Sequence, residues 1–179
     1  MEILFEEFIS AILSADPASF FGRYVRVRSQ MTIGRFARDE KNRELFSLRP
    51  DIVIGWPVVE AIIDIKYKQL DPGERKMGVS QLDLYQMFAY VTKTGAHRCM
   101  LLYPDALVSQ ARDFFLSVPS SEEENVEIPL MVRAIPLSYD LNSQDGWDTF
   151  LKRLREIVRH LVDLPATSLE GELAGVEAS

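Results

Sequence analysis

Hydrophobic positions along the chain follow helical spacing in some segments and strand spacing in others, which predicts a mixed α/β fold. Hydrophobic residues three and four apart predict helices at residues 2–13, 81–93 and 145–162, and another helix is expected at residues 105–117. Short hydrophobic runs predict strands at residues 23–29, 46–54, 58–66, 98–103 and 126–137. Residues 31–42 are polar and predict a loop or a short strand. The pattern as a whole predicts a mixed β-sheet flanked by helices.

Turn residues indicate how these strands are connected. Gly55, Trp56 and Pro57 predict a turn, so the strands on either side are expected to form a hairpin. Pro50 interrupts the first of these strands and predicts a bend or a sheet edge. The helix that follows Ser80, a residue suited to an N-cap, lies between two hydrophobic strands. Parallel pairing of those two strands would complete a strand–helix–strand unit.

Length and composition favour one soluble domain. A chain of 179 residues is expected to fold as a single domain over residues 1–164, and the small, acidic residues 165–179 are expected to be disordered. No hydrophobic run reaches the roughly 18 residues that span a bilayer. The first residues lack the basic flank of a signal peptide. A cytoplasmic protein without membrane contact is therefore expected.

The available metal ligands point to a site built from oxygen atoms. The single Cys99 excludes an intramolecular disulfide and a cysteine-only metal site within one chain. His97 and His160 are the only two histidines, which is too few for an all-nitrogen site. Oxygen ligands favour magnesium, manganese or calcium.

Charge is distributed unevenly along the chain. The net charge is −7, whereas residues 23–49 carry eight Arg and Lys against three Asp and Glu. These basic residues form either a solvated surface or a patch that holds phosphates. The overall negative charge argues against strong DNA binding by this chain alone. The candidate DNA-contacting residues are Arg23, Arg26, Arg28 and Lys68.

Two acids and a lysine occupy hydrophobic strands in the stretch from residue 49 to residue 90. Asp51 lies in the first strand of the predicted hairpin, and Asp64 and Lys66 lie two residues apart in the second. Because side chains alternate across a strand, Asp64 and Lys66 are expected on one face, with Ile63 and Ile65 on the other. Charged side chains in a hydrophobic strand need pairing, water or a metal ion.

This arrangement suits hydrolysis of a phosphodiester bond. Asp51 and Asp64 would supply two metal ligands, and the backbone carbonyl of Ile65 a third, because magnesium usually retains several waters. Lys66 would lie beside the attacking water or stabilise charge on the phosphate. An Asp-x-Lys sequence alone is weak, since it also describes an exposed ion pair on an edge strand. The pattern becomes more specific with a Pro-Asp about a dozen residues earlier and with Gln81 and Tyr85 one helical turn apart. A chance match of all these features is much rarer than a chance Asp-x-Lys.

Several stretches resemble a known family. RPDIVI at residues 49–54, AIIDIKYK at 61–68 and GVSQLDLYQMFAY at 78–90 resemble the PD-(D/E)xK nuclease superfamily, with the Q-x-x-x-Y helix of its RecB-like branch. MEILFEEFISAIL at residues 1–13 and LLYP at 101–104 are similar to the McrC-type nuclease subunit of the 5-methylcytosine restriction system. The resemblance covers residues 1–104 clearly. It implies a restriction-endonuclease-like core.

The resemblance also implies residue roles, in a nuclease that uses Mg²⁺, with Mn²⁺ as the alternative. Lys66 would be the catalytic lysine, while Gln81 and Tyr85 would border the site; alternatively, these two are a helix cap and a half-buried tyrosine. Glu6 would approach the metal from the first helix. Glu7 is the competing candidate, and only one can face the site because the two point about 100° apart. The implied metal ligands are Asp51, Asp64, Glu6 and the carbonyl of Ile65.

The family resemblance further implies two partners, DNA and a GTP- or ATP-hydrolysing McrB-like motor. The sequence contains no Walker-type glycine–lysine loop, so nucleotide hydrolysis would belong to that motor. Two alternatives stay open. One is a stand-alone RecB-like nuclease acting on DNA ends or branched DNA, and the other is a non-catalytic assembly module that keeps the nuclease fold.

Overall fold

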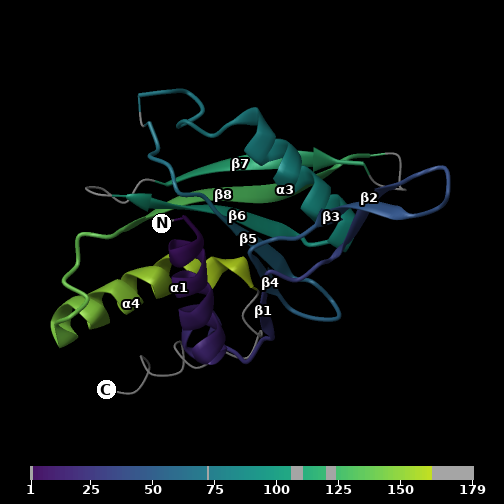
Figure 1. The fold of residues 1–179 in the computed structure, drawn as a ribbon. Coiled ribbons are helices and arrows are strands. Elements are labelled where there is room, and N and C mark those ends of the chain that lie inside the picture. The colour runs from purple at the N-terminus through teal and green to yellow at the C-terminus, as the bar shows by residue number, and fades with distance from the viewer. Residues whose placement is uncertain (1, 72, 106–110, 120–123, 163–179) are drawn as a thin grey trace, which may run out of the picture.

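A six-stranded mixed sheet forms the centre of the computed structural model, which describes residues 2–71, 73–105, 111–119 and 124–162 (Figure 1). In spatial order its strands are β1 (Val27–Ser29), β4 (Ile52–Ile54), β5 (Ala61–Ile65), β6 (Arg98–Asp105), β8 (Val126–Pro136) and β7 (Ala111–Val118). Strand β6 runs parallel to both β5 and β8, whereas the remaining neighbours are antiparallel. These pairings confirm the predicted mixed sheet, the β4–β5 hairpin and the parallel strand–helix–strand unit.

Helices cover both faces of this sheet. One face carries α1 (Glu2–Ala15), α2 (Pro17–Phe21), α4 (Gln144–Val158) and the 3-10 turn η1 (Arg159–Leu161), and the other carries α3 (Gln81–Thr94). Because strand residues alternate in direction, Ile63 and Ile65 of β5 join the core beneath α1 and α4, whereas Ile62 joins the core beneath α3. Strand β5 is therefore buried on both sides. No helix in the described residues is long and hydrophobic enough to cross a membrane.

The helix predicted at residues 105–117 is wrong, because this part of the chain contains strand β7, which pairs antiparallel with β8 along its whole length. Burial alternates as in a strand: Leu116 is buried, whereas Phe115 is exposed. Residues 106–110 lie outside the described residues, as does the acidic tail at 165–179. The error arose because a short stretch that mixes hydrophobic and polar residues fits both helical and strand spacing.

The strand predicted at residues 46–54 is two separate strands. β3 (Glu44–Leu48) ends before Pro50, and β4 begins after it in a different sheet. The strand predicted at residues 23–29 is confined to β1. The bend predicted at Pro50 is confirmed, because Pro50, which has no backbone N–H, lies between β3 and β4.

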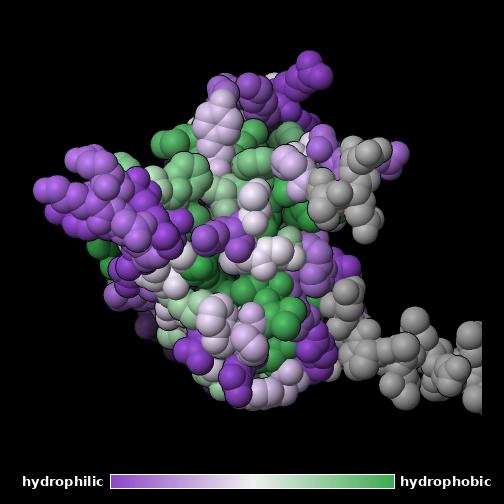
Figure 2. Space-filling view, turned by 90° about the vertical axis from the view of Figure 1, so that its right-hand side faces the viewer, coloured by the Kyte–Doolittle hydropathy of each residue, from purple (hydrophilic) through white to green (hydrophobic). Residues whose placement is uncertain are grey.

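A two-stranded hairpin of β2 (Gly34–Arg38) and β3 stands apart from the main sheet. It exposes Phe36 and Phe46. Figure 2 views the molecule from the side on which this hairpin lies and shows hydrophobic surface among hydrophilic side chains. The hairpin matters to the site because its two ends connect to Gln30, just after β1, and to Asp51, just before β4.

Candidate active site

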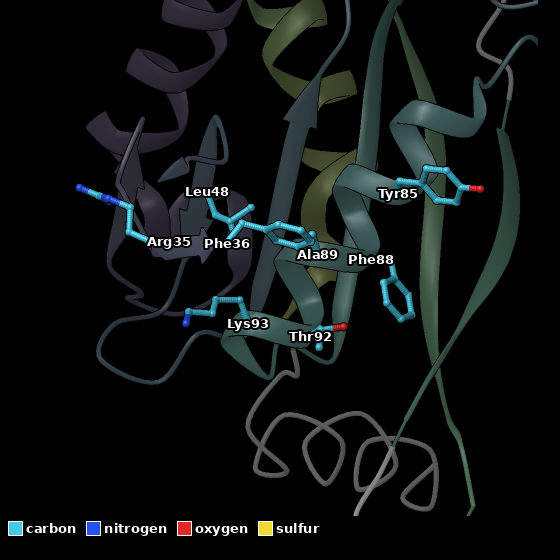
Figure 3. A pocket seen from close by; sticks show the side chains of 8 residues that line it. All are labelled: Arg35, Phe36, Leu48, Tyr85, Phe88, Ala89, Thr92 and Lys93. Carbon is cyan, nitrogen blue, oxygen red and sulfur yellow. The ribbon is translucent and has the colours of Figure 1, made fainter. Parts of the chain in front are cut away.

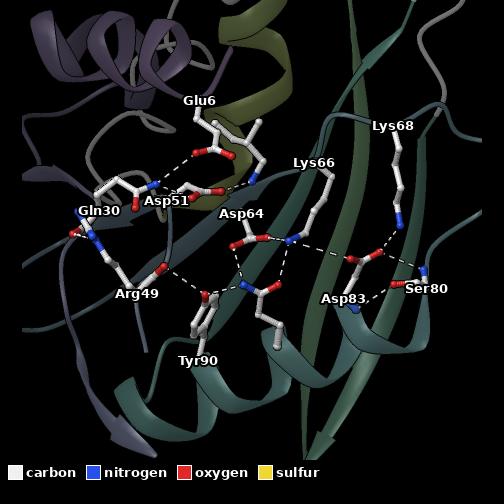
Figure 4. Close-up of polar contacts among 12 residues, drawn as sticks. Glu6, Gln30, Arg49, Asp51, Asp64, Lys66, Lys68, Ser80, Asp83 and Tyr90 are labelled. Carbon is white, nitrogen blue, oxygen red and sulfur yellow. Dashed lines mark hydrogen bonds and ion pairs between the residues drawn. The ribbon is translucent and has the colours of Figure 1, made fainter. Parts of the chain in front are cut away.

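Asp51 lies where the chain leaves the hairpin and enters the main sheet. Its Oδ2 accepts a hydrogen bond of 2.7 Å from the backbone N–H of Ile65. Its Oδ1 accepts another of 2.7 Å from Nε2 of Gln30 (Figure 4). Asp51 is thus a buried carboxylate whose orientation is fixed by one donor on each oxygen.

Asp64 is the second carboxylate, near the end of β5. The β4–β5 register places Ile52 opposite Ile63, so Asp51 and Asp64 meet at the open end of the hairpin. Asp64 is 1% exposed. Burial raises the pKa of Asp64 to about 6, and the nearby charge of Asp51 adds to the increase against the opposing effect of Lys66. Two acids that disfavour each other's charge are suited to sharing a cation.

Lys66 lies on the same face as Asp64, as the strand alternation predicts. Its Nζ is 2.6 Å from Oδ2 of Asp64 and 4.0 Å from Oδ1 of Asp83. Burial alone would lower the pKa of Lys66, but the negative charges of Asp64, Asp83 and Asp51 outweigh burial and raise it. The side chain is therefore an ammonium at neutral pH, so it acts as a positive charge rather than as a base.

Gln86 and Tyr90 of α3 connect the acids to the lysine. Gln86 accepts a hydrogen bond of 2.8 Å from Lys66 through Oε1, and its Nε2 donates to Asp64 Oδ1 at 3.4 Å and to the Tyr90 hydroxyl at 2.7 Å. The Tyr90 hydroxyl in turn donates to the backbone oxygen of Arg49 at 3.2 Å. Burial, together with the charge of Asp64, raises the pKa of Tyr90 to about 12, so the hydroxyl keeps its proton. One face of α3 thus links Asp64 and Lys66 to the segment that precedes Asp51 (Figure 4).

Asp83 anchors the start of the same helix beside the site. It forms a capping box with Ser80, in which each side chain accepts a hydrogen bond from the other's backbone N–H. Its Oδ2 also accepts a hydrogen bond of 2.5 Å from Nζ of Lys68. Lys68, a candidate DNA-contacting residue, is therefore part of the polar network around Lys66.

Glu6 approaches the site from α1, while Glu7 is exposed. Phe5, Ile9 and Leu13 bury one stripe of this helix and so fix its rotation. In this rotation Oε2 of Glu6 lies 3.4 Å from Nε2 of Gln30, the group that also donates to Asp51. The structure thus places Glu6 beside the acid pair.

The other predicted helix residues point elsewhere. Gln81 and Tyr85 are exposed and hydrogen-bonded to each other. Tyr85 lines a surface pocket on the outer side of α3, together with Phe36 of the hairpin and Phe88 (Figure 3). Within the part of the chain that the structure describes, neither residue forms a hydrogen bond to Asp51, Asp64 or Lys66. The structure does not bring this pair to the acid–lysine cluster.

The three candidate arginines also lie apart from that cluster. Arg23 forms an ion pair with Glu60, and the Arg26 carbonyl accepts the N–H of Gly55. Both therefore lie at the turn end of the β4–β5 hairpin, opposite the acids. Arg28 is exposed on the edge strand β1.

Sequence reasoning missed Gln30, Gln86 and Tyr90. A signal for two of them was present: Gln86 and Tyr90 repeat the Gln-x-x-x-Tyr spacing of Gln81 and Tyr85, five residues later. Five residues rotate a helix by roughly 140°, so the two pairs cannot face the same way. Packing of the helix on the sheet selects the second pair. Gln30 had no such signal, because a turn outside the motif brings it to the acids.

Comparisons with known proteins agree with this architecture. The fold is similar to that of a chain in the refined half-complex from the tetradecameric assembly of Thermococcus gammatolerans McrB AAA+ hexamers with bound McrC, with a TM-score of 0.51 and 19% identity. That similarity covers 88% of this chain and 33% of the other, so the chain spans about a third of the solved one. No curated protein matches the sequence. Residues 1–104 match the family described as McrBC 5-methylcytosine restriction system component, and the chain belongs to this family.

Proposed function

We propose that this chain is a metal-dependent DNA nuclease domain of the PD-(D/E)xK type that hydrolyses phosphodiester bonds as the endonuclease of a restriction system. One observation carries the proposal: Asp51, Asp64 and Lys66 meet at the open end of a buried hairpin. A domain that only binds DNA has no use for two buried carboxylates facing phosphate, because they would repel it without a cation.

The donor set suits Mg²⁺, or Mn²⁺ in its place. Asp51 and Asp64 would hold the ion, since both are oxygen donors. Burial first, and the charge of Asp51 second, raise the pKa of Asp64, and a bound cation would favour its charged form. No cluster of three Asp, Glu, His or Cys side chains close enough to hold a metal occurs in the described residues. Water and phosphate would therefore complete the ligand set, with Glu6 and the Ile65 carbonyl as further candidates. When bound, the ion would neutralise the phosphate and lower the pKa of water.

The protein's own groups have separate tasks in this proposal. The Lys66 ammonium stabilises the negative charge that grows on the phosphate, because its charge persists at neutral pH. Gln86 holds Lys66 and Asp64 in one arrangement through a single amide. The Ile65 N–H and Gln30 keep both oxygens of Asp51 in place. Positions set by such bonds reduce the reorganisation that the reaction requires.

We also propose that a nucleotide-hydrolysing motor protein delivers the DNA. The solved neighbour belongs to an assembly of McrB AAA+ hexamers with McrC, which supports a motor of that kind as the partner. The net charge of −7 supports the same conclusion, because a protein of this charge has little long-range attraction for DNA. Selection of the DNA site would then belong to the partner.

Cleavage of supercoiled plasmid tests the proposed activity. The wild type, Asp64→Asn and Lys66→Ala are compared with Mg²⁺ or Mn²⁺, with and without an McrB-like motor and GTP. The proposal expects metal-dependent cleavage by the wild type and its loss in both variants. Equal cleavage by the wild type and Asp64→Asn would refute the assignment of the site.

A further inference from the structure

Gln30 occupies a backbone conformation that long side chains seldom adopt. Its φ is 50°, in the left-handed region that favours glycine and asparagine. The residue directly follows β1 and turns the chain away from the sheet edge towards the β2–β3 hairpin. Left-handed residues other than glycine cluster at functional sites, where the surrounding structure compensates for the strain.

The backbone of Gln30 is bound on both sides to the segment that carries Asp51. Its N–H donates to the Asp51 carbonyl oxygen at 2.9 Å, and its own carbonyl oxygen accepts from Nε of Arg49 at 2.6 Å. Arg49 is itself held by the Tyr90 hydroxyl. The position of Gln30 is therefore tied directly to the segment that carries Asp51.

The side chain of Gln30 joins two carboxylates from different elements. Its Nε2 lies 2.7 Å from Oδ1 of Asp51 and 3.4 Å from Oε2 of Glu6 of α1 (Figure 4). One amide nitrogen can serve both because it carries two hydrogens. An amide is also neutral, so it orients the carboxylates without cancelling their charge. A lysine or arginine here would compete with a metal ion for the same oxygens.

We propose that Gln30 is a positioning residue that couples Glu6 to Asp51, so that both carboxylates face the metal together. The inference rests on the proposed metal-dependent function and adds a residue to it. It also explains why Glu6 rather than Glu7 belongs to the site, since only Glu6 is within reach of the amide.

Two variants separate this role from a purely structural one. Gln30→Met keeps the length of the side chain and removes its donor. Gln30→Asn keeps the amide, favours the left-handed backbone and is too short to bridge the two acids. Gln144→Asn is the matched control, because Gln144 also donates to a carboxylate, that of Asp148, but does so on α4. Circular dichroism melts in EDTA report whether each variant folds.

Calorimetric titration with Mn²⁺ is the primary readout, and plasmid cleavage is the second. Both Gln30 variants are expected to bind Mn²⁺ about tenfold or more weakly than the wild type, as is typical when a residue that orients a metal ligand is removed. Their kcat is expected to fall while KM for plasmid stays unchanged, because Gln30 positions carboxylates rather than DNA. The Gln144→Asn control is expected to match the wild type in both assays.

The outcomes distinguish this inference from the proposed function. If folded Gln30→Met and Gln30→Asn bind Mn²⁺ as the wild type does, while Asp64→Asn does not, the role of Gln30 is refuted and the metal site stands. If the wild type binds no Mn²⁺, both ideas are refuted. If Gln30→Asn binds Mn²⁺ normally and only Gln30→Met fails, the amide matters but the bridge to Glu6 does not, which also overturns the proposal.

Discussion

The backbone N–H of Ile65 donates a 2.7 Å hydrogen bond to Oδ2 of Asp51, so the last residue of β5 fixes the acid that precedes β4. This bond links Asp51 to the strand that carries the other two candidate residues, because Asp64 precedes Ile65 and Lys66 follows it. A substitution that removes this acceptor at Asp51 should therefore affect both stability and the site.

Substitution of Asp51 should separate folding from chemistry. Asp51→Asn keeps an oxygen that can accept the Ile65 N–H, and is expected to fold with near wild-type stability while losing Mn²⁺ binding. Asp51→Ala leaves a buried N–H unpaired and is expected to cost about 1–3 kcal/mol of unfolding free energy. Urea unfolding measures the stability of both variants. Equal destabilisation by the two variants would mean that the hydrogen bond contributes nothing.

Asp64 should make the stability of the metal-free protein depend on pH. Its pKa is about 6 in the folded state against an ordinary value of 3.8, so folding favours the protonated acid. The stabilisation is complete below about pH 4 and is lost as the pH rises through 6. Relative to Asp64→Asn, the wild type should therefore lose roughly 2 kcal/mol between pH 4 and pH 7.5.

Urea unfolding in EDTA at several pH values gives this difference directly. Effects of titrating groups that lie far from Asp64 cancel, because both proteins share them. A stability difference that does not change with pH would show that Asp64 titrates normally.

Lys66 should act as a fixed positive charge. Lys66→Ala is expected to lower single-turnover cleavage by about 10²–10³-fold, the range for loss of one group that stabilises developing charge. Binding of DNA to the variant in Ca²⁺ should change little, and Lys152→Ala on the exposed face of α4 is the control. A wild-type rate that rises with an apparent pKa near 8, and loses that dependence in Lys66→Ala, would instead make Lys66 a base.

The two Gln-x-x-x-Tyr pairs on α3 should differ in their importance. Gln86→Ala removes the amide that contacts Lys66, Asp64 and Tyr90, and we expect a drop in kcat of about tenfold or more. Gln81→Ala should have the smaller effect, since Gln81 bonds to Tyr85 on the outer side of the helix. Plasmid cleavage ranks the two variants, and the reverse order would support the pair that the sequence first suggested.

Asp83 should contribute to stability through the start of α3. Asp83→Ala removes the capping box with Ser80 and the bond to Lys68, and is expected to cost about 1 kcal/mol. Burial raises the pKa of Asp83, but the donors from Lys68 and Ser80 outweigh it and lower the pKa overall. This stabilisation is present above about pH 4 and is lost as the pH falls further. An unchanged melting temperature in Asp83→Ala at pH 7 would contradict it.

Much of the fold follows from local patterns in the sequence. Alternation in β5 places Asp64 and Lys66 on one face, and the Gly55–Pro57 turn predicts the hairpin that brings Asp51 opposite. These features depend on neighbouring residues only. Strand β7 was missed because eight residues with two phenylalanines fit either a helix or an edge strand until β8 is there to pair with them.

The rest of the site depends on contacts that sequence spacing does not reveal. Gln86 and Gln81 carry the same motif, and only the packing of α3 against the sheet decides which one faces Lys66. Gln30 reaches Asp51 through a left-handed turn between two strands of different sheets. Helical phase and loop direction are tertiary properties, so they became visible only in the structure.

Binding of Mn²⁺, followed by electron paramagnetic resonance, tests most directly whether Asp51 and Asp64 form one metal site, and it needs no partner protein. Wild type, Asp51→Asn and Asp64→Asn are titrated at pH 7.5, above the pKa of about 6 for Asp64. We predict one bound ion in the wild type and loss of tight binding in each variant. Wild-type binding that survives in both folded variants, or no binding by the wild type, would contradict a shared metal site.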